Sequence, residues 1–194
     1  MKERQRRREG ARRAQESQRR LQAQRQRQRR RQQLLWGAGV LAVAGAIVAL
    51  VLLTRGPNVG EAVPTLAAGH EPPYTYSTRP PTSGRHLPAV APYGYTTTLL
   101  QAEAAVHNME HGAVVIWFQP GDATLAGQVR DLVAALGRQC LVAGPYATMD
   151  DPIAVTAWGR ILRLDAFDAA RITEFVEAYR GRLGPEGGAC RQES

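Results

Sequence analysis

The sequence is poor in cysteine and histidine. Its 194 residues include only 2 cysteines and 4 histidines. Cys140 and Cys190 are too far apart to form a C-x-x-C motif, so thiol–disulfide exchange of the thioredoxin type is not expected. Ser83 lacks an oxyanion loop or a strand–turn–helix elbow, which argues against a nucleophile–base pair with His86. The sequence therefore contains no complete catalytic signature.

Basic residues are concentrated at the N-terminus. Residues 1–33 hold 14 of the 25 Lys and Arg residues but only 3 of the 17 Asp and Glu residues, a net charge of +11. The remaining residues carry a net charge of −3, so the total of +8 belongs to this segment. A mildly acidic remainder argues against nucleic-acid binding by a folded domain.

The basic segment, residues 1–33, has almost no apolar positions and cannot bury a core. We expect it to be disordered or a solvated helix. Beside a membrane its arginines would attract anionic lipid headgroups, each contributing about 1 kcal/mol near the surface. The segment is therefore predicted to be a basic cytoplasmic tail.

Residues 34–53 form a run without a charged residue. A helix rising 1.5 Å per residue over about twenty residues crosses a hydrocarbon core of roughly 30 Å. A cleaved signal peptide is disfavoured because its charged region would be too long. Arg55 alone follows the run closely, so positive-inside asymmetry puts the N-terminus in the cytoplasm. We expect a single-pass cell-membrane protein, with a linker over 54–67 and an extracytoplasmic domain over 68–194.

Small residues recur within this apolar run, at Ala38, Ala42 and Ala46. Spacing of this kind permits close packing of two membrane helices. It predicts a weak homodimer that forms through this helix. The other predicted partners are the lipid bilayer and an envelope protein.

Hydrophobic periodicity predicts a compact α+β, or small α/β, domain with a mixed sheet of about four strands and three helices. Expected helices cover 98–111, ended by Gly112, 125–136, ended by Gly137, and 172–183, with Asp165 or Asp168 as cap. Expected strands cover 113–118, 140–143, 153–158 and 161–164. A strand–helix–strand unit favours right-handed parallel pairing. The order of elements from 113 onward suggests a thioredoxin-like arrangement.

All four histidines fall within one 42-residue window: His70, His86, His107 and His111. Histidine is the commonest metal ligand among side chains. His107 and His111 are four residues apart, so a helix would place both on one face, able to share an ion. Our first hypothesis is a domain that binds zinc, another divalent transition metal or a small ligand. His86, His107 and His111 would be the ligands, with His70 and Glu110 as additional ones.

Two other interpretations of the histidines remain open. The string from His107 to His111 fits H-x-x-E-H, the inverted zincin motif, in which Glu110 would be the base of a metal-dependent hydrolase. Such an enzyme needs a downstream acidic ligand, for which Glu174 and Glu177 are candidates. Alternatively, the histidines are structural and hydrogen-bonded, and the domain is a cell-envelope interaction module.

A proline-rich segment precedes the second histidine. Prolines stiffen the backbone, and Gly84 permits a turn that other residues rarely adopt. The segment is predicted to be a rigid loop that presents His86 and shapes the site; its residues are Pro80, Pro81, Thr82, Ser83 and Gly84.

Four strings of the sequence resemble a known bacterial family. They are YSTRPPTSGRHLP (76–88), Gly94-Tyr95, HNMEHGAVVIWFQP (107–120) and TAWGR (156–160). They are similar to the family called domain of unknown function 3105, over about residues 68–185. The resemblance implies one N-terminal membrane helix and names no activity. The family's characteristic strings include Pro80, Pro81, Ser83, Gly84, His86, His107, Glu110 and His111.

The sequence departs from that family's pattern at two positions. Proline usually stands where this chain has Arg85, and leucine where it has Met109. The first departure is expected to loosen the loop. The second argues against a copper site built on Met109.

The two cysteines are predicted to form a disulfide, because an even pair outside the cytoplasm tends to be oxidised. Closing the loop between Cys140 and Cys190 would stabilise the fold by about 4 kcal/mol on the chain-entropy model. Two unpaired thiols are the alternative.

Overall fold

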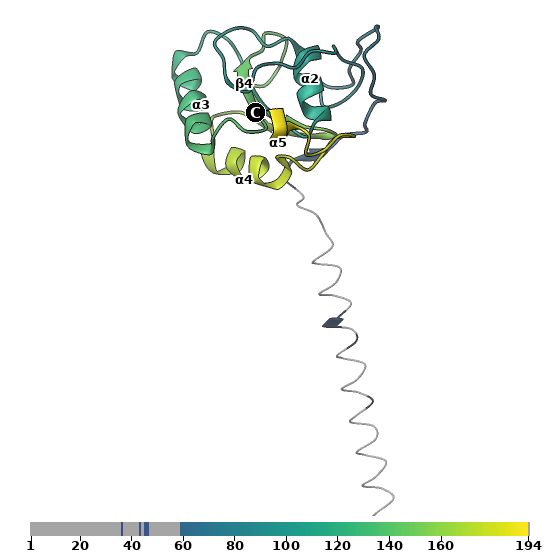
Figure 1. The fold of residues 1–194 in the computed structure, drawn as a ribbon. Coiled ribbons are helices and arrows are strands. Elements are labelled where there is room, and N and C mark those ends of the chain that lie inside the picture. Colours follow the sequence, from purple (N-terminus) through teal and green to yellow (C-terminus); the bar gives the residue numbers. More distant parts are fainter. Residues whose placement is uncertain (1–35, 37–42, 44, 47–58, 194) are drawn as a thin grey trace, which may run out of the picture. The chain divides into compact units, whose positions relative to one another are not determined.

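The computed structural model describes residues 59–193, together with Trp36, Val43, Gly45 and Ala46 (Figure 1). The predicted tail over 1–33 and most of the predicted membrane span over 34–53 lie outside the described residues. Among the residues described, no helix has the length and apolar character needed to cross a bilayer. The chain divides after Gly56 into two units, and the C-terminal unit carries the sheet and its helices.

A six-stranded mixed sheet forms the centre of this unit, in the order β1-β6-β5-β3-β4-β2. The strands are β1 (Glu61–Ala62), β2 (Gly94–Tyr95), β3 (Val114–Phe118), β4 (Leu141–Pro145), β5 (Ile153–Ala157) and β6 (Arg160–Leu164). β3 pairs in parallel with β4 and antiparallel with β5, and β5 and β6 form the predicted hairpin. β1 and β2 extend the two edges, so the expected count of about four strands was too low.

Four helices occur in the described part of the chain: α2 (Ala102–Glu110), α3 (Ala123–Leu136), α4 (Ala169–Tyr179) and the short α5 (Cys190–Glu193). α3 connects β3 to β4, as the predicted parallel unit requires. Asp122 caps α3, and of the two predicted candidates for α4 it is Asp168 that caps it. The fold is thus a mixed α+β domain in which β3, α3, β4, the hairpin and α4 follow in the predicted order.

Both faces of the sheet are covered. Val114, Ile116 and Phe118 of β3 pack in a core with α3 and α4, whereas Val115 and Trp117 pack with α2. This alternation follows from the two-residue period of a strand. In Figure 1, α3 and α4 accordingly lie apart from α2, with β4 of the sheet between them.

Two segment boundaries differ from expectation. α2 begins at Ala102 rather than at residue 98, because Thr96 and Leu100 donate their backbone N–H groups to carbonyls of Ala143 and Pro145 in β4. The predicted linker over 54–67 also contains domain structure, since β1 pairs with β6 and Val59 bonds to Tyr179.

The C-terminal strap, residues 181–190, packs against the end of α2 through backbone hydrogen bonds. Gly181 donates to Gly112, Glu186 to Glu110, and both Gly188 and Cys190 to His111. The last carbonyls of a helix have no partner within it, so the strap satisfies them. The predicted disulfide is present: Cys190 is bonded to Cys140, just before β4, with their Cα atoms 5.2 Å apart.

Removing the disulfide should loosen the strap. We expect the double variant Cys140→Ser/Cys190→Ser to lose up to about 4 kcal/mol of unfolding free energy. Without the cross-link, the unfolded chain regains the conformational entropy that closure of a loop over 50 positions had removed. Urea denaturation of both proteins measures this. The reduced wild type should resemble the variant, and equal stability of oxidised wild type and variant would contradict the prediction.

Gly184 is required because the strap approaches α2 closely. A Cβ atom at Gly184 would run into the carbonyl oxygens of Met109 and Glu110, whereas a Cβ atom at Gly121 would meet nothing within 4 Å. Both glycines have a φ of 99°, so the backbone strain that alanine introduces is the same at the two positions. We expect Gly184→Ala to reduce the unfolding free energy by about 1–3 kcal/mol more than Gly121→Ala, as overpacking usually does. Equal losses in thermal or urea unfolding would refute the close contact.

Candidate metal centre

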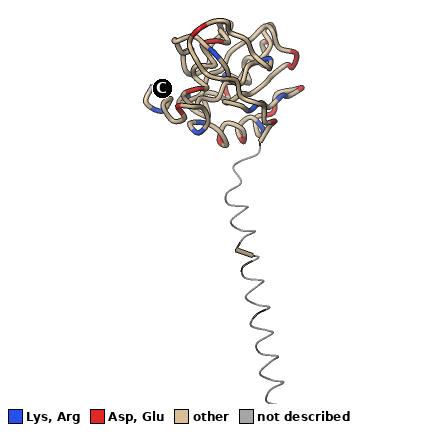
Figure 2. Tube along the Cα trace, turned by 90° about the vertical axis from the view of Figure 1, so that its right-hand side faces the viewer, with Lys and Arg blue, Asp and Glu red and all other residues tan. Residues whose placement is uncertain are grey.

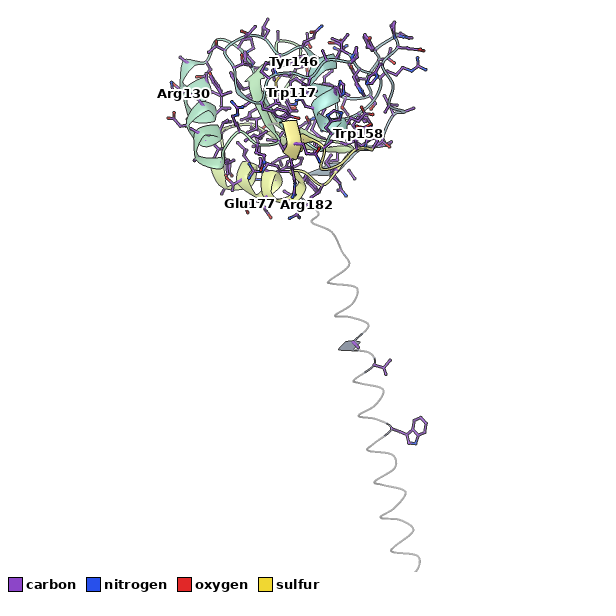
Figure 3. All side chains as sticks on the ribbon, in the orientation of Figure 1. Trp117, Arg130, Tyr146, Trp158, Glu177 and Arg182 are labelled. Carbon is purple, nitrogen blue, oxygen red and sulfur yellow. A yellow bond between two sulfur atoms is a disulfide. The ribbon has the colours of Figure 1, made fainter. Side chains whose placement is uncertain are left out.

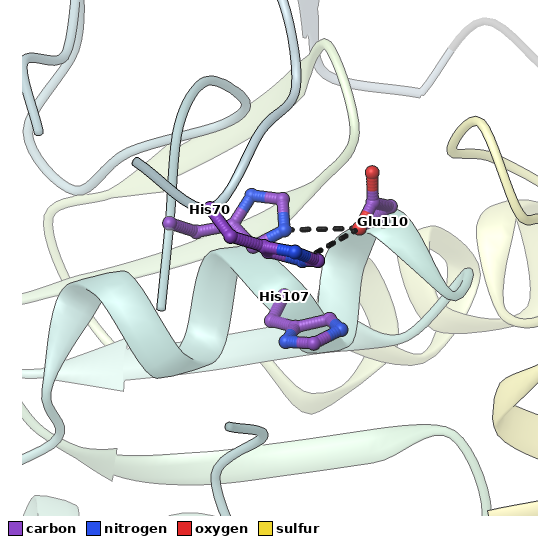
Figure 4. A group of neighbouring side chains, drawn as sticks. His70, His107 and Glu110 are labelled. Carbon is purple, nitrogen blue, oxygen red and sulfur yellow. Dashed lines mark hydrogen bonds and ion pairs between the residues drawn. The ribbon is translucent and has the colours of Figure 1, made fainter. Parts of the chain in front are cut away.

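Four side chains converge beside the C-terminal half of α2. His107 and Glu110 come from this helix, His86 from the proline-rich loop, and His70 from the preceding exposed loop. One potential ligand atom from each of the four lies within 4.8 Å of those of the others. Figure 4 shows His70, His107 and Glu110 directed toward one centre, with dashed lines ending on the Glu110 carboxylate. The histidines that the sequence predicted to cluster are therefore close in space.

The proline-rich loop is fixed by buried polar groups. Residues 80–84 are all buried, and Gly84 has a positive φ of 123°. The Ser83 hydroxyl accepts a hydrogen bond from the Leu66 backbone, and Gly159 donates to the Thr82 carbonyl. Ser83 therefore helps to anchor the loop. Both ring nitrogens of His86 contact other groups, so no Ser83–His86 pair forms.

Arg85 ties the proline-rich loop to the loop that carries His70. Its guanidinium lies 3.4 Å from the carbonyl oxygen of Glu71, and its backbone forms a bridge with Gly69. Its carbonyl accepts from the Tyr76 hydroxyl. The Arg85 position thus connects the two loops, which is a role that the sequence did not predict.

His86 is fully buried and contacts two oxygen atoms. Its Nδ1 lies 2.8 Å from the Gly84 carbonyl oxygen, and its Nε2 lies 2.9 Å from Glu110 Oε2. A carbonyl can only accept, so Nδ1 carries the hydrogen. In neutral His86, Nε2 then presents a lone pair to the carboxylate. Such a contact requires a proton or a cation between the two atoms.

His107 repeats this arrangement. Its Nδ1 donates to the Leu87 carbonyl at 2.8 Å, and its Nε2 lies 3.2 Å from His111 Nε2. Burial lowers the pKa of His107; the Leu87 carbonyl opposes this shift, while His111, His86 and His70 add to it. A lowered pKa keeps the imidazole neutral and its Nε2 available as a ligand.

His70 and His111 flank this pair. The His70 side chain is 51% exposed, and its Nε2 lies 4.0 Å from Glu110 Oε2. His111 follows the end of α2 and lies outside the group of four, but its Nε2 is 3.3 Å from Glu186 Oε2 of the strap. Glu186 was not identified from the sequence, because no periodic pattern marks a residue in an irregular segment. The candidates Glu174 and Glu177 lie on α4 instead.

Two further α2 residues hold the helix in place. The Asn108 side chain bonds both the N–H and the carbonyl of Ala91. Met109 is fully buried on the sheet side, where its sulfur accepts from the Thr156 hydroxyl. Met109 is thus engaged away from the histidines, in agreement with the argument against a copper site based on it.

Comparison with protein families gives one match, to the model described as "Protein of unknown function (DUF3105)", over residues 70–193. The chain belongs to the DUF3105 family. Neither the curated proteins nor the solved structures contain a match. The match begins at His70, so all four side chains of the cluster lie within the DUF3105 domain.

Acidification should destabilise the metal-free DUF3105 domain through His107. Its pKa is lowered in the folded state, whereas the unfolded chain takes up the proton near the ordinary value of about 6.5. The unfolding free energy should therefore fall as the pH drops from about 6.5 toward the folded pKa. Urea denaturation across this range, with chelator present, measures the slope. His107→Asn should flatten it, and an unchanged slope would contradict the assignment.

Proposed function

We propose that the DUF3105 domain binds one divalent transition-metal ion, with zinc as the first choice, through His70, His86, His107 and Glu110. The observation that carries this proposal is the hydrogen bonding of the two buried histidines. Each donates Nδ1–H to a main-chain carbonyl, of Gly84 or Leu87. Metal-binding histidines are commonly oriented by such a bond, which fixes the tautomer and directs the other nitrogen to the ion.

Electrostatics also favours a cation at this centre. The Nε2 atom of His86 lies 2.9 Å from a carboxylate oxygen of Glu110, which is 8% exposed. A buried carboxylate needs a partner, because the loss of hydration is costly. A divalent ion would satisfy the carboxylate and the imidazole lone pairs together.

The spacing of the donor atoms suits a metal after a small movement. Bonds of 2.0–2.1 Å in a tetrahedral site put the donors about 3.3 Å apart. The observed separations reach up to 4.8 Å within the group, so at least one donor must move inward. His70 is the exposed member of the group, so its side chain has the most room to move. Three nitrogens and one oxygen, without thiolate, are donors that zinc accepts.

His111 occupies a supporting position in this proposal. In the metal-free domain its Nε2–H can donate to the Nε2 lone pair of His107, 3.2 Å away. Metal binding would take that lone pair, and the His111 N–H would turn to Glu186, at 3.3 Å. His111 would then stabilise both states without being a ligand.

The geometry favours Glu110 as a donor rather than as the base of a hydrolase. The catalytic base of such a hydrolase must face a water molecule that occupies an open coordination position of the metal. Glu110 Oε2 lies instead within the donor group, beside His86. Binding without hydrolysis is therefore the function that we propose.

We also propose that the domain is held at the outer face of a membrane by a helix over residues 34–53. The disulfide supports an oxidising compartment. The charge-free run over 34–53 supports the span, and the arginines of residues 1–33 support contact of the tail with anionic headgroups.

Metal analysis of the full-length protein tests the binding proposal. We expect one zinc ion per chain, and we expect zinc affinity to fall at least about tenfold in His70→Ala and in Glu110→Gln. His70 is exposed, so its variant should keep the stability of the metal-free wild type. Isothermal titration with zinc, and X-ray absorption for nitrogen and oxygen donors, provide the measurements.

Glu174→Gln is the matched control, since Glu174 is an exposed carboxylate on α4. Its zinc affinity should equal that of the wild type. If the wild type retains no stoichiometric zinc, and neither zinc nor chelator changes its thermal stability, the histidines are structural and the proposal is wrong.

A further inference from the structure

A pocket whose lining contains no histidine lies beside the disulfide. It has a volume of about 420 Å³ and is lined by Gln139, Cys140, Glu177, Arg180, Arg182 and Arg191. Figure 3 labels Glu177 and Arg182 close together at the α4 edge of the domain. Figure 2 shows Lys and Arg positions on the trace near the C-terminus. Three arginines therefore surround one cavity in an otherwise mildly acidic domain.

These arginines have no acidic partner among the residues described. The ion pairs of arginine there include those of Arg130 and Arg163, whose carboxylate partners are Asp131, Glu61 and Asp151. Glu177 lines the pocket, but no ion pair joins it to an arginine there. Each guanidinium group carries a positive charge, so the three arginines make the pocket basic.

Two of the three guanidinium groups are held in place by main-chain carbonyls. Arg180 Nη1 donates to the carbonyls of Leu136 and Gly137, and Arg182 Nη1 donates to Ala178. These three hydrogen bonds cap helix ends, and they use only one nitrogen of the Arg180 guanidinium and one of the Arg182 guanidinium. The Arg191 guanidinium lies against Gly181, where a Cβ atom would come within 2.6 Å of Nε. Donors of all three groups remain for a ligand.

We propose that this arginine pocket binds the phosphoryl group of a phosphate ester. Arginine pairs with phosphate oxygens in a planar, bidentate geometry, and the bonds are charge-assisted. The volume lies within the range of about 300–1,000 Å³ that is usual for small-molecule sites, so an organic part fits beside the phosphoryl group. Glu177 supplies the one negative charge of the lining and opposes the anion.

Two kinds of ligand offer this phosphoryl chemistry. One is a soluble phosphate monoester, and the other is the diester headgroup of a phospholipid. Val59, where the continuous described chain begins, hydrogen-bonds to the Tyr179 hydroxyl. Val59 therefore contacts the α4 residue that precedes Arg180 of the pocket. A lipid headgroup must therefore be tested together with the soluble ester.

Titration calorimetry of the full-length protein in mild detergent tests the proposal. The probes are glycerol phosphate, which is a monoester, and glycerophosphoglycerol, which is the diester headgroup of phosphatidylglycerol. We expect saturable binding of one of them to the wild type. Arg191→Gln, and independently Arg182→Gln, should weaken this binding by about tenfold or more, as loss of a charged hydrogen bond predicts.

Two further variants distinguish specific binding in the pocket from a general effect of the protein's net charge. Glu177→Gln should tighten binding a few-fold, because a repelling charge is removed; a merely structural role for the pocket gives no such gain. Arg130→Gln changes the net charge equally at a distant, paired arginine and should leave the affinity unchanged. The basic residues 1–33 are present in every variant and contribute equally.

Each outcome has a defined meaning. Monoester binding that depends on Arg191 supports a soluble ligand, and diester binding that depends on Arg191 supports a lipid headgroup. Equal affinity of Arg191→Gln, Arg182→Gln and Arg130→Gln for both probes would overturn the proposal, as would no binding to the wild type. Thermal unfolding of each variant confirms that loss of binding is not loss of fold.

Discussion

The burial of His86 is the constraint on which the site depends. A fully buried imidazole needs a partner at each ring nitrogen, since an unpaired buried polar group costs about 1–3 kcal/mol. Gly84 supplies a carbonyl from the same loop, and Glu110 supplies a carboxylate from α2. The histidine thereby joins a proline-rich loop to a helix. His107 strengthens the junction through Leu87, so the same bonds that close the structure also orient the ring nitrogens.

Much of this domain could be predicted from the sequence because its main elements have clear periodicity. The apolar run of β3, the helical spacing of α3 and the turn at Gly159 each lead to the observed element. β1 and β2 could not be predicted, since a two-residue edge strand has no period. The start of α2 was also missed, because β4 carbonyls bind the preceding backbone and override local propensity.

The candidate site was predictable in its residue types but not in its geometry. Four-residue spacing correctly suggested that His107 and His111 lie together. Spacing could not show that Glu110 faces His86, because that contact joins residues 24 positions apart. Nor could it find Glu186, which reaches His111 only through the fold of the strap. Long-range contacts of this kind depend on how loops pack, and loops have no periodic signal.

The strap connects the two charged sites of the domain, and its cross-link has a consequence for maturation. Its backbone covers the end of α2 near the histidines, while Arg182 and the adjoining Arg191 belong to the arginine pocket. Thiols in a reducing compartment stay unpaired, so a newly made chain there lacks the Cys140–Cys190 tie. For a domain exported as proposed above, the tie forms only after the chain has reached an oxidising compartment. Under the same proposal, an ion that the domain binds there would come from the compartment of arrival and not from the compartment of synthesis.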